Sequence, residues 1–189
     1  MNQFLKKFFK HIKCTGAIAP SSKHLSKFIV DLANLSNKKC IIELGSGTGV
    51  FTKEIVKQKN SKSTFFCLEI NKEFVSITKK NCPGIIVYNS SADKINKYLL
   101  KHNEKYCDCI ISGLPWAAFD NSLQINLLNS IYDSLSKNGV FLTFAYIQGS
   151  YLPSGMKFKQ LLLKKFKSVE KSKIIWKNLP PAFVYICKK

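Results

Sequence analysis

The chain has 189 residues, of which 46% are hydrophobic, and this length and composition are typical of a single globular domain. No apolar run approaches the roughly 20 residues that span a bilayer, and no signal-peptide pattern is present, so we expect a cytoplasmic protein. The seven cysteines are scattered and odd in number, which argues against a disulfide framework. Cys107 and Cys109 lack the second ligand pair of a metal site, so we expect no metal.

The formal net charge is +19, and all 30 basic residues are lysines. This charge indicates a polyanionic partner, either nucleic acid or an anionic lipid surface. Because arginine makes the bidentate contacts that read guanine and phosphate, an all-lysine chain favours diffuse attraction to a negative surface over base readout. The alternative is that an AT-rich genome imposes lysine throughout the chain.

Residues 2–13 predict a short basic amphipathic helix. Five apolar side chains share one helical face, namely Phe4, Leu5, Phe8, Phe9 and Ile12. Four lysines lie mostly opposite, with no acid among them. Such a helix suits a membrane interface, and the alternative is a helix packed on the domain with its lysines in water.

Helices and strands are predicted to alternate along the rest of the chain. After a loop at 15–22, a helix capped by Ser21 or Ser22 runs to about Leu35. Strands are predicted at 40–44, 64–70, 85–88, 107–112 and 140–146, and helices at 48–59, 72–81, 91–102, 122–136 and 157–167. This alternation predicts an α/β fold with a doubly wound, mostly parallel sheet and helices on both faces.

Two extended segments, 168–176 and 182–187, close the chain. The link between them contains Leu179-Pro180-Pro181 and is too short for a helical crossover. We therefore expect these last two strands to form an antiparallel pair.

A glycine turn follows the first predicted strand, in C-I-I-E-L-G-S-G-T-G-V-F-T at 40–52. Glu43 ends the apolar run, and Gly45, Gly47 and Gly49 alternate after it. Glycines permit positive φ and a close approach of the backbone to a ligand. The order strand, turn, helix predicts a site for a nucleoside-containing cofactor, and the alternative is a plain tight turn. No glycine stands where an NAD-binding motif needs its third one, and no G-K-[ST] of a P-loop is present.

Polar groups at other predicted strand ends complete a candidate site, because ligands of open α/β sheets bind beyond the carboxyl ends of the strands. Glu69 ends the second strand, where a carboxylate can accept hydrogen bonds from ribose hydroxyls. Asp93, in S-A-D after the third strand, can accept from an adenine amine. The alternatives are a solvated strand end for Glu69 and a helix cap for Asp93. The fourth strand ends in G-L-P-W at 113–116, which can form a rigid turn beside the reacting centre.

Together E-L-G-S-G-T-G, L-E-I, S-A-D and the fourth-strand motif resemble a class I methyltransferase that uses S-adenosylmethionine (SAM). The resemblance covers roughly residues 38–188 and implies a Rossmann-like, seven-stranded sheet with an antiparallel last strand. It implies a domain at 37–189, preceded at 1–36 by the amphipathic helix and a second helix. The residues that it implies for SAM binding are Glu43, Gly45, Ser46, Gly47, Gly49, Glu69, Ile70, Ala92, Asp93 and Gly113.

Two branches of that superfamily compete. The ribosomal RNA adenine dimethyltransferases have an N-L-P-Y-like motif whose Asn and aromatic residue hold the target adenine, but here Gly113 stands in place of the Asn. More of the chain resembles the bacterial phospholipid N-methyltransferases. That similarity lies in T-G-A-I-A-P-S-S at 15–22, G-V-F-T at 49–52, S-G-L-P-W at 112–116 and W-K-N-L-P-P-A-F-V-Y at 176–185.

The phospholipid branch implies methylation of phosphatidylethanolamine and its methylated intermediates towards phosphatidylcholine. It also implies a monomer that is peripheral on the inner face of the membrane and contacts anionic lipid through residues 2–13. Trp116 and Tyr146 are the candidates for positioning the substrate amine by cation–π contact, and core packing is the alternative for both. RNA is the less favoured acceptor. Three alternatives remain: an enzyme that methylates an RNA adenine, an enzyme that methylates a small amine, and an inactive SAM-binding module.

Overall fold

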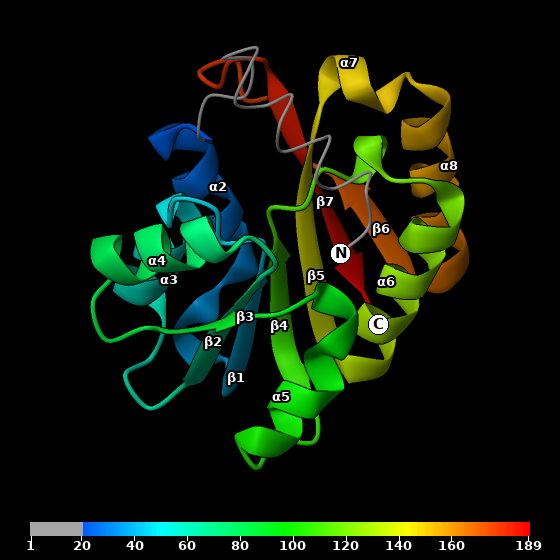
Figure 1. Cartoon of the computed structure of the whole chain (residues 1–189). Helices are drawn as coiled ribbons and strands as arrows, with labels where there is room; N and C mark the ends of the chain where they lie inside the picture. The colour runs from blue at the N-terminus through cyan, green and yellow to red at the C-terminus, as the bar shows by residue number, and fades with distance from the viewer. Residues whose placement is uncertain (1–20) are drawn as a thin grey trace.

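The computed structural model describes residues 21–189 (Figure 1). The predicted helix at 2–13 and most of the loop at 15–22 lie outside the described residues. The strands are β1 Cys40–Leu44, β2 Thr64–Glu69, β3 Ile86–Asn89, β4 Cys107–Ser112, β5 Leu135–Tyr146, β6 Ser168–Lys171 and β7 Ala182–Lys188. They form a seven-stranded sheet in the order β3-β2-β1-β4-β5-β7-β6.

Strand direction follows the predicted Rossmann-like pattern. β1 pairs parallel with β2 and β4, β2 pairs parallel with β3, and β4 pairs parallel with β5. β7 pairs antiparallel with both β5 and β6. The predicted mostly parallel sheet and its antiparallel last strand are therefore confirmed.

Helices cover both faces of this sheet. Their bounds are α2 Lys23–Ala33, α3 Val50–Gln58, α4 Lys72–Asn81, α5 Ile95–Lys101, α6 Asn121–Ser134, α7 Ile147–Ser150 and α8 Pro153–Lys165. Side chains of α2, α3 and α4 share one buried cluster with the sheet, and side chains of α5, α6 and α8 share the other. Within residues 21–189, no helix has the length and apolar character needed to cross a membrane.

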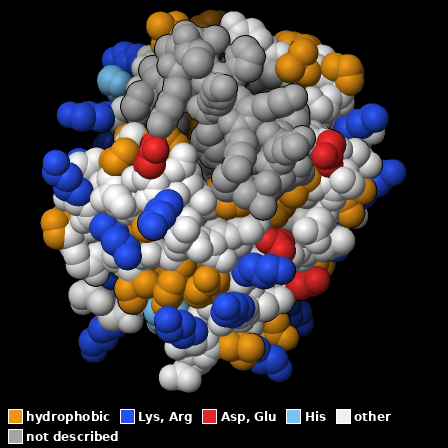
Figure 2. Space-filling view, viewed as in Figure 1, with side chains coloured by type: hydrophobic (Ala, Val, Ile, Leu, Met, Phe, Trp, Pro, Cys, Tyr) orange, Lys and Arg blue, Asp and Glu red, His pale blue; other side chains and the backbone are white. Residues whose placement is uncertain are grey.

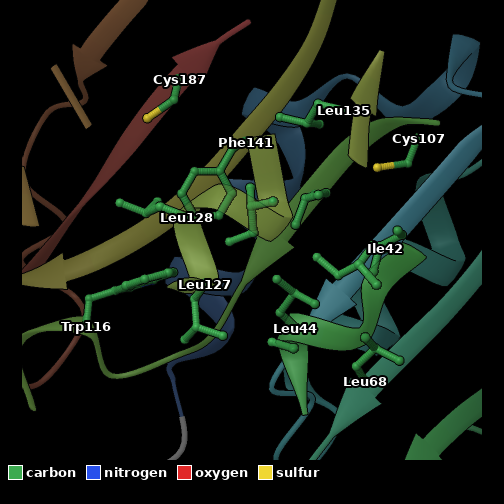
Figure 3. Close-up of a cluster of buried hydrophobic side chains, with 14 of the residues drawn as sticks. Ile42, Leu44, Leu68, Cys107, Trp116, Leu127, Leu128, Leu135, Phe141 and Cys187 are labelled. Atoms are coloured by element: carbon green, nitrogen blue, oxygen red, sulfur yellow. The ribbon is translucent and has the colours of Figure 1, made fainter. Parts of the chain in front are cut away.

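The central strands are buried on both faces, as their near-continuous apolar runs require. Figure 3 shows the cluster beneath α6, where Ile42 and Leu44 of β1 and Leu68 of β2 lie on the same face of the sheet as Leu127. Trp116 belongs to this cluster too. The core therefore reaches the carboxyl ends of β1 and β2, where the glycine turn begins.

Local capping explains where three helices begin. The side chain of Ser22 accepts from the N–H of Leu25 at the start of α2, so Ser22 is the cap of the two predicted candidates. The side chain of Asn71 caps α4, and that of Asp120 caps α6. The cap at Asn71 matters for the site, because it lies two residues after the end of β2 and fixes the start of α4 there.

Several predicted boundaries were wrong, and three of them are informative. Helix α6 ends at Ser134, because Leu135 has extended backbone angles and pairs with Cys107, so β5 starts well before residue 140. α8 begins at Pro153 rather than 157, since proline suits the first helical turn. β6 stops at Lys171, and beyond it only Ile175 pairs again with β7, as an isolated bridge to Ala182.

Candidate active site

A cavity of about 540 Å³ lies beyond the carboxyl ends of the parallel strands. Its volume is in the range, roughly 300–1,000 Å³, of sites for small molecules. One side is formed by the glycine turn after β1 and by the ends of β2 and β3. The other side carries the S-G-L-P-W segment and apolar or aromatic side chains from β5, α6 and the α7–α8 corner. The cavity thus has a polar backbone-lined half and an apolar half.

The glycine turn needs its glycines for backbone conformation. Gly45, Gly47 and Gly49 all have positive φ, of 76°, 55° and 85°. A Cβ on Gly47 would meet no atom within 4 Å, so positive φ, rather than lack of space, selects glycine there. Gly45, Ser46 and Gly47 line the cavity, whereas Gly49 is not among the lining residues within 21–189.

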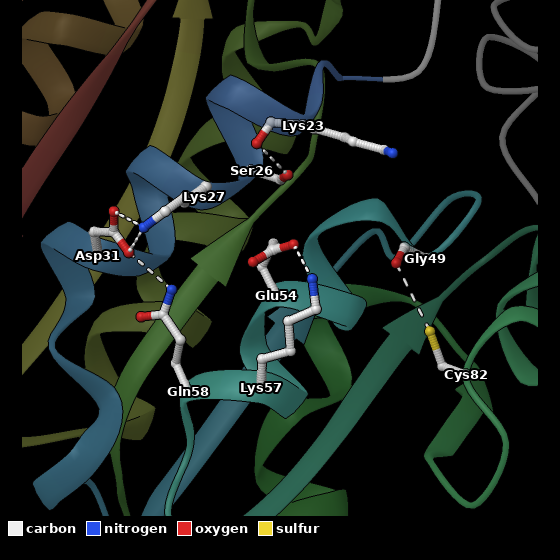
Figure 4. A network of polar contacts seen from close by, with 9 residues as sticks. All are labelled: Lys23, Ser26, Lys27, Asp31, Gly49, Glu54, Lys57, Gln58 and Cys82. Carbon is white, nitrogen blue, oxygen red and sulfur yellow. Dashed lines mark hydrogen bonds and ion pairs between the residues drawn. The ribbon is translucent and has the colours of Figure 1, made fainter.

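Helix α4 holds this turn from behind. Thr78, which is fully buried, donates from Oγ1 to the carbonyl of Gly47 at 2.9 Å and lies 3.0 Å from the hydroxyl of Ser46. Asn81 donates from Nδ2 to the carbonyl of Thr48 at 2.9 Å. Figure 4 shows the contact from Cys82 Sγ to the carbonyl of Gly49, at 3.7 Å.

These α4 contacts escaped the sequence reasoning. The signal is a set of small side chains with polar atoms, at 78 and 81 on α4 and at 82 just after it, but their partners lie some 30 residues earlier in the chain. Only the assembled fold shows that this face meets the glycine turn. The glycine turn is therefore held in place by side chains of α4 as well as by its own sequence.

The carboxylate of Glu69 faces the glycine turn. Oε2 accepts from the N–H of Gly47 at 3.0 Å, and Oε1 accepts from the N–H of Asn71 at 2.8 Å. The residue is 4% exposed, lines the cavity, and is the one carboxylate among the described lining residues. Burial raises the pKa of Glu69, and the backbone N–H groups that it accepts from oppose this rise. Each oxygen keeps a lone pair, as a ribose diol requires.

Glu43 lies under the glycine turn and is not among the described residues that line the cavity. Its Oε2 accepts from Thr52 Oγ1 at 2.6 Å and from Cys67 Sγ at 3.2 Å, which ties β1 to α3 and β2. Among the described residues, Oε1 has no hydrogen-bond partner. Burial raises the pKa of Glu43 to about 7, and the hydrogen bonds from Thr52 and Cys67 oppose this rise. The structure therefore places Glu43 as a support of the turn and not at the cavity wall.

The end of β3 contributes backbone and small side chains to the cavity. Ser90, Ser91 and Ala92 line it, together with Ile70 from the end of β2. Asp93 is not among the described lining residues, and its Oδ2 lies 2.9 Å from Lys94 Nζ. The predicted contact of Asp93 with an adenine amine therefore stays a prediction, and so does SAM binding by Ala92 and Ile70, although both line the cavity.

The S-G-L-P-W segment forms a tight turn against the glycine turn. Gly113 donates from its N–H to the carbonyl of Leu44 at 2.8 Å. A Cβ on Gly113 would lie 2.7 Å from the carbonyl oxygen of Gly45, which is backbone, so no side chain fits at 113 unless the cofactor turn moves. The hydroxyl of Ser112 accepts from the N–H of Leu114 and from Trp116 Nε1, both at 3.2 Å.

Trp116 is both core and cavity wall. It is 3% exposed, and its ring stacks on Phe158 of α8 at 4.4 Å between centroids. Phe119 and Phe141 meet the same ring edge-on. Phe158 covers one face of the indole, so most of the Trp116 ring belongs to the core, as the packing alternative expects. A small part still lines the cavity, so substrate positioning by Trp116 stays a prediction.

The far wall of the cavity is aromatic. Tyr146, at the end of β5, lines it beside Phe144, with the two ring centroids 5.4 Å apart, and Tyr185 of β7 lines it as well. Burial raises the pKa of Tyr146 and of Tyr185, so both hydroxyls keep their protons at neutral pH. Phe144 and Tyr185 escaped the sequence reasoning, because their place in the wall depends on the pairing of β5 with β7.

The family model for "Ribosomal RNA adenine dimethylase" matches residues 20–167 of the chain. The chain belongs to this family. It is therefore a class I SAM-dependent N-methyltransferase, and the predicted recognition, enzyme class and cofactor are confirmed. Among residues 21–189, no group of three or more histidines, cysteines and acids is placed to hold a metal ion.

Individual relatives of the chain include a lipid N-methyltransferase and an RNA methyltransferase. An ornithine lipid N-methyltransferase from Singulisphaera acidiphila is 28% identical over 188 residues, which cover 98% of this chain and 94% of that protein. Ribosomal RNA small subunit methyltransferase A from Alkaliphilus oremlandii is 32% identical over 95 residues, which cover 49% of this chain and 32% of that protein. The crystal structure of an O-methyltransferase from Bacillus cereus in complex with SAH matches with a TM-score of 0.71 at 13% identity, over 100% of this chain and 92% of that chain.

The cavity fits SAM on its own geometry. The glycine turn presents open backbone at Gly47, and Glu69 offers two carboxylate oxygens already oriented by backbone N–H groups. Ile70 and Ala92 supply apolar contacts of the kind that an adenine ring needs on its faces. These residues would hold the nucleoside in the polar half, which leaves the aromatic half for the methyl acceptor.

Proposed function

We propose that the protein transfers the methyl group of SAM to the amine of a membrane phospholipid, phosphatidylethanolamine and its methylated intermediates, towards phosphatidylcholine. The observation that carries the proposal is Gly113, whose position has no room for a side chain. An asparagine there would supply the acceptor for an adenine amine, and this fold excludes it unless the cofactor turn moves. The near full-length similarity to a lipid N-methyltransferase supports the same acceptor class.

The apolar half of the cavity suits a lipid amine. Its polar groups are few, and aromatic rings from Tyr146, Phe144 and Tyr185 form its wall. Rings of this kind stabilise an ammonium by cation–π contact, worth roughly 0.5–2 kcal/mol. A product that gains methyl groups loses N–H donors, so an aromatic wall suits it better than a hydrogen-bonding wall.

SAM supplies a methyl group on a sulfonium, so that transfer to a neutral amine forms one C–N bond, breaks one C–S bond and leaves SAH. The protein contributes chiefly by positioning the two reactants. Glu69 is engaged by Gly47 and Asn71, and the wall tyrosines have raised pKa values, so neither is a ready base. The amine proton therefore passes to water at the open end of the cavity.

Residues 2–13 would hold the enzyme at the lipid surface. They lie outside the described residues, and the proposal for them rests on their basic amphipathic sequence. Near anionic lipid, each lysine contributes on the order of 1 kcal/mol. Deletion of residues 1–13 is expected to weaken binding to anionic vesicles and to leave SAM affinity unchanged.

Methylation of an RNA adenine is the second candidate, because the family model and one relative carry that name. Methyl-labelled SAM separates the two candidates when it is offered in parallel with phosphatidylethanolamine vesicles, ornithine lipid vesicles and unmodified ribosomal RNA. Label extracted with phosphatidylethanolamine supports the proposal. Label with ornithine lipid alone corrects the headgroup, and label with RNA alone contradicts a lipid acceptor.

A further inference from the structure

Five large apolar side chains are exposed beside the mouth of the cavity, and together they are called the apolar rim. The set consists of Tyr151, Leu152, Met156, Trp176 and Leu179. Leu179, Tyr151 and Trp176 are the most exposed of them, with 83%, 74% and 71% of their surface exposed. Exposed apolar side chains that cluster, unlike scattered ones, mark contact sites for a partner or a membrane.

The rim comes from two segments that meet at the carboxyl end of β5. The first is the α7–α8 corner, where Leu152 both lines the cavity and is 52% exposed. Figure 2 shows hydrophobic side chains gathered at the upper right, over α7 and the start of α8. The second is the β6–β7 loop. The carbonyl of Pro181, in this loop, accepts a hydrogen bond from the N–H of Ile147 at 3.0 Å. Both segments therefore flank Tyr146 and the cavity.

The β6–β7 loop is a built structure that turns Trp176 and Leu179 outward. Between them lies Asn178, which is 2% exposed. Its Oδ1 accepts from the N–H of Ser22 at 2.9 Å, and its Nδ2 donates to the carbonyl of Pro180 at 2.7 Å. With Asn178 buried, the nearby side chains of Trp176 and Leu179 remain exposed.

The charged side chains within the two rim segments are all of one sign. No Asp or Glu occurs between Asp133 and Glu170 or after Glu170, so both rim segments lack acids. Exposed lysines accompany the apolar side chains, at Lys157 in α8 and at Lys173 and Lys177 in the β6–β7 loop. Apolar and aromatic side chains mixed with lysines complement an anionic bilayer, since amphipathic rings sit at the headgroup level and lysines attract acidic lipid.

We propose that the apolar rim is a membrane-docking surface, which seats the mouth of the cavity on an anionic lipid bilayer. The surface deepens the proposed function, because it would let a lipid amine reach the cavity from the membrane plane. It is separate from residues 2–13 and made by the folded domain itself. Trp176 and Leu179 enter the interface, and the three side chains of the α7–α8 corner border the entry path.

Fluorescence of Trp176 tests the docking directly. The chain has two tryptophans, and Trp116 is 3% exposed, so Trp176 is the one that can meet lipid. The full chain is mixed with vesicles of phosphatidylglycerol and phosphatidylcholine, with and without brominated acyl chains. Docking predicts a blue shift of the emission and quenching by the brominated chains, and Trp176→Phe removes both signals.

A matched pair of variants measures the contribution of the rim to binding. Trp176→Gln/Leu179→Gln is expected to weaken vesicle partitioning by roughly tenfold or more. The control is Leu100→Gln, a side chain 73% exposed on α5, at the opposite end of the molecule in Figure 1. The control should bind as the native chain does, and equal melting temperatures show that all of the variants are folded.

Three results would overturn the docking surface. The first is co-sedimentation with anionic vesicles without quenching of Trp176, which assigns binding to another surface. The second is no co-sedimentation at all. The third is shielding of Trp176 from iodide before vesicles are added, which indicates that another segment or a second copy covers the rim. None of these readouts needs methyl transfer, so failure of the lipid acceptor and failure of the docking surface are distinguished.

Discussion

Replacing Glu69 with alanine should weaken SAM binding strongly and leave the fold intact. The carboxylate is 4% exposed and fixed by Gly47 and Asn71 at 3.0 and 2.8 Å, so its remaining lone pairs are preoriented for two ribose hydroxyls. A hydrogen bond to a charged group contributes roughly 1.5–3 kcal/mol. Two such bonds lost together correspond to about 3–6 kcal/mol, or a rise in Kd of about 10²–10⁴-fold.

The fold should tolerate this change. Alanine leaves the N–H groups of Gly47 and Asn71 without their acceptor, but the space that the carboxylate vacates opens to the cavity, where water replaces it. Burial disfavours the ionised form of Glu69, so its removal also relieves a cost. We therefore expect the free energy of unfolding to change by no more than about 2 kcal/mol.

Titration calorimetry with SAM and with SAH measures the effect. Glu69→Gln keeps one acceptor oxygen but turns an amide donor towards a backbone donor, so an intermediate loss of affinity is expected. Glu170→Gln is the matched control, because that carboxylate is exposed on β6, where it pairs with Lys188. A Kd for Glu69→Ala within about threefold of the native value would refute the ribose assignment.

Three further predictions concern the support of the cofactor turn. The pKa of Glu43 rises from 4.5 to about 7 on folding, so the free energy of unfolding should fall by about 3 kcal/mol as pH rises through that window. Chemical denaturation at pH 4.5 and 8 should show this fall in the native chain and not in Glu43→Gln. Thr78→Val should lower SAM affinity by about tenfold, because the hydrogen bond to the carbonyl of Gly47 is lost. Calorimetry measures this change, and Ser76→Ala on the same helix is the control that should leave the affinity unchanged. Gly113→Ala should shift the turn at Gly45, which reduces SAM affinity and destabilises the fold by about 1–3 kcal/mol in thermal melts.

Features that depend on local sequence were predictable. The positive φ angles of the glycine turn fall on three glycines within residues 45–49, which the sequence shows directly. Glu69 ends a strand that the sequence marks by its apolar run. The sheet follows in the same way, because buried strands and capped helices alternate at regular spacing. Membership of a methyltransferase family was predictable from the spacing of these motifs along the chain.

Features that depend on distant contacts were not predictable. Trp116 belongs largely to the core because Phe158 lies on its ring, some 40 residues later in the chain. Thr78 supports Gly47 only because α4 packs behind the turn. Asp93 lies 2.9 Å from Lys94 and is not among the described residues that line the cavity, which its place after β3 did not reveal. In each case the residue type was evident, and the neighbour that decides its role was not.

The Gly113 position shows how both kinds of information combine. The sequence shows glycine at the position where the similar RNA methylase motif has an asparagine. A single substitution of this kind carries little information about the acceptor by itself. The fold adds that a Cβ would lie 2.7 Å from the carbonyl oxygen of Gly45. The glycine is therefore built into the packing of the two turns, and the proposed lipid acceptor rests on this backbone contact.

A competition assay tests the lipid acceptor most directly. Purified full-length protein and methyl-labelled SAM are incubated with phosphatidylethanolamine vesicles and unmodified ribosomal RNA in one tube, and the two acceptors are separated by solvent extraction. The account predicts label in the organic phase, in methylated phosphatidylethanolamine identified by mass spectrometry, and none of it when Glu69→Ala replaces the native protein. Label in the RNA fraction, with an unlabelled organic phase, would contradict it.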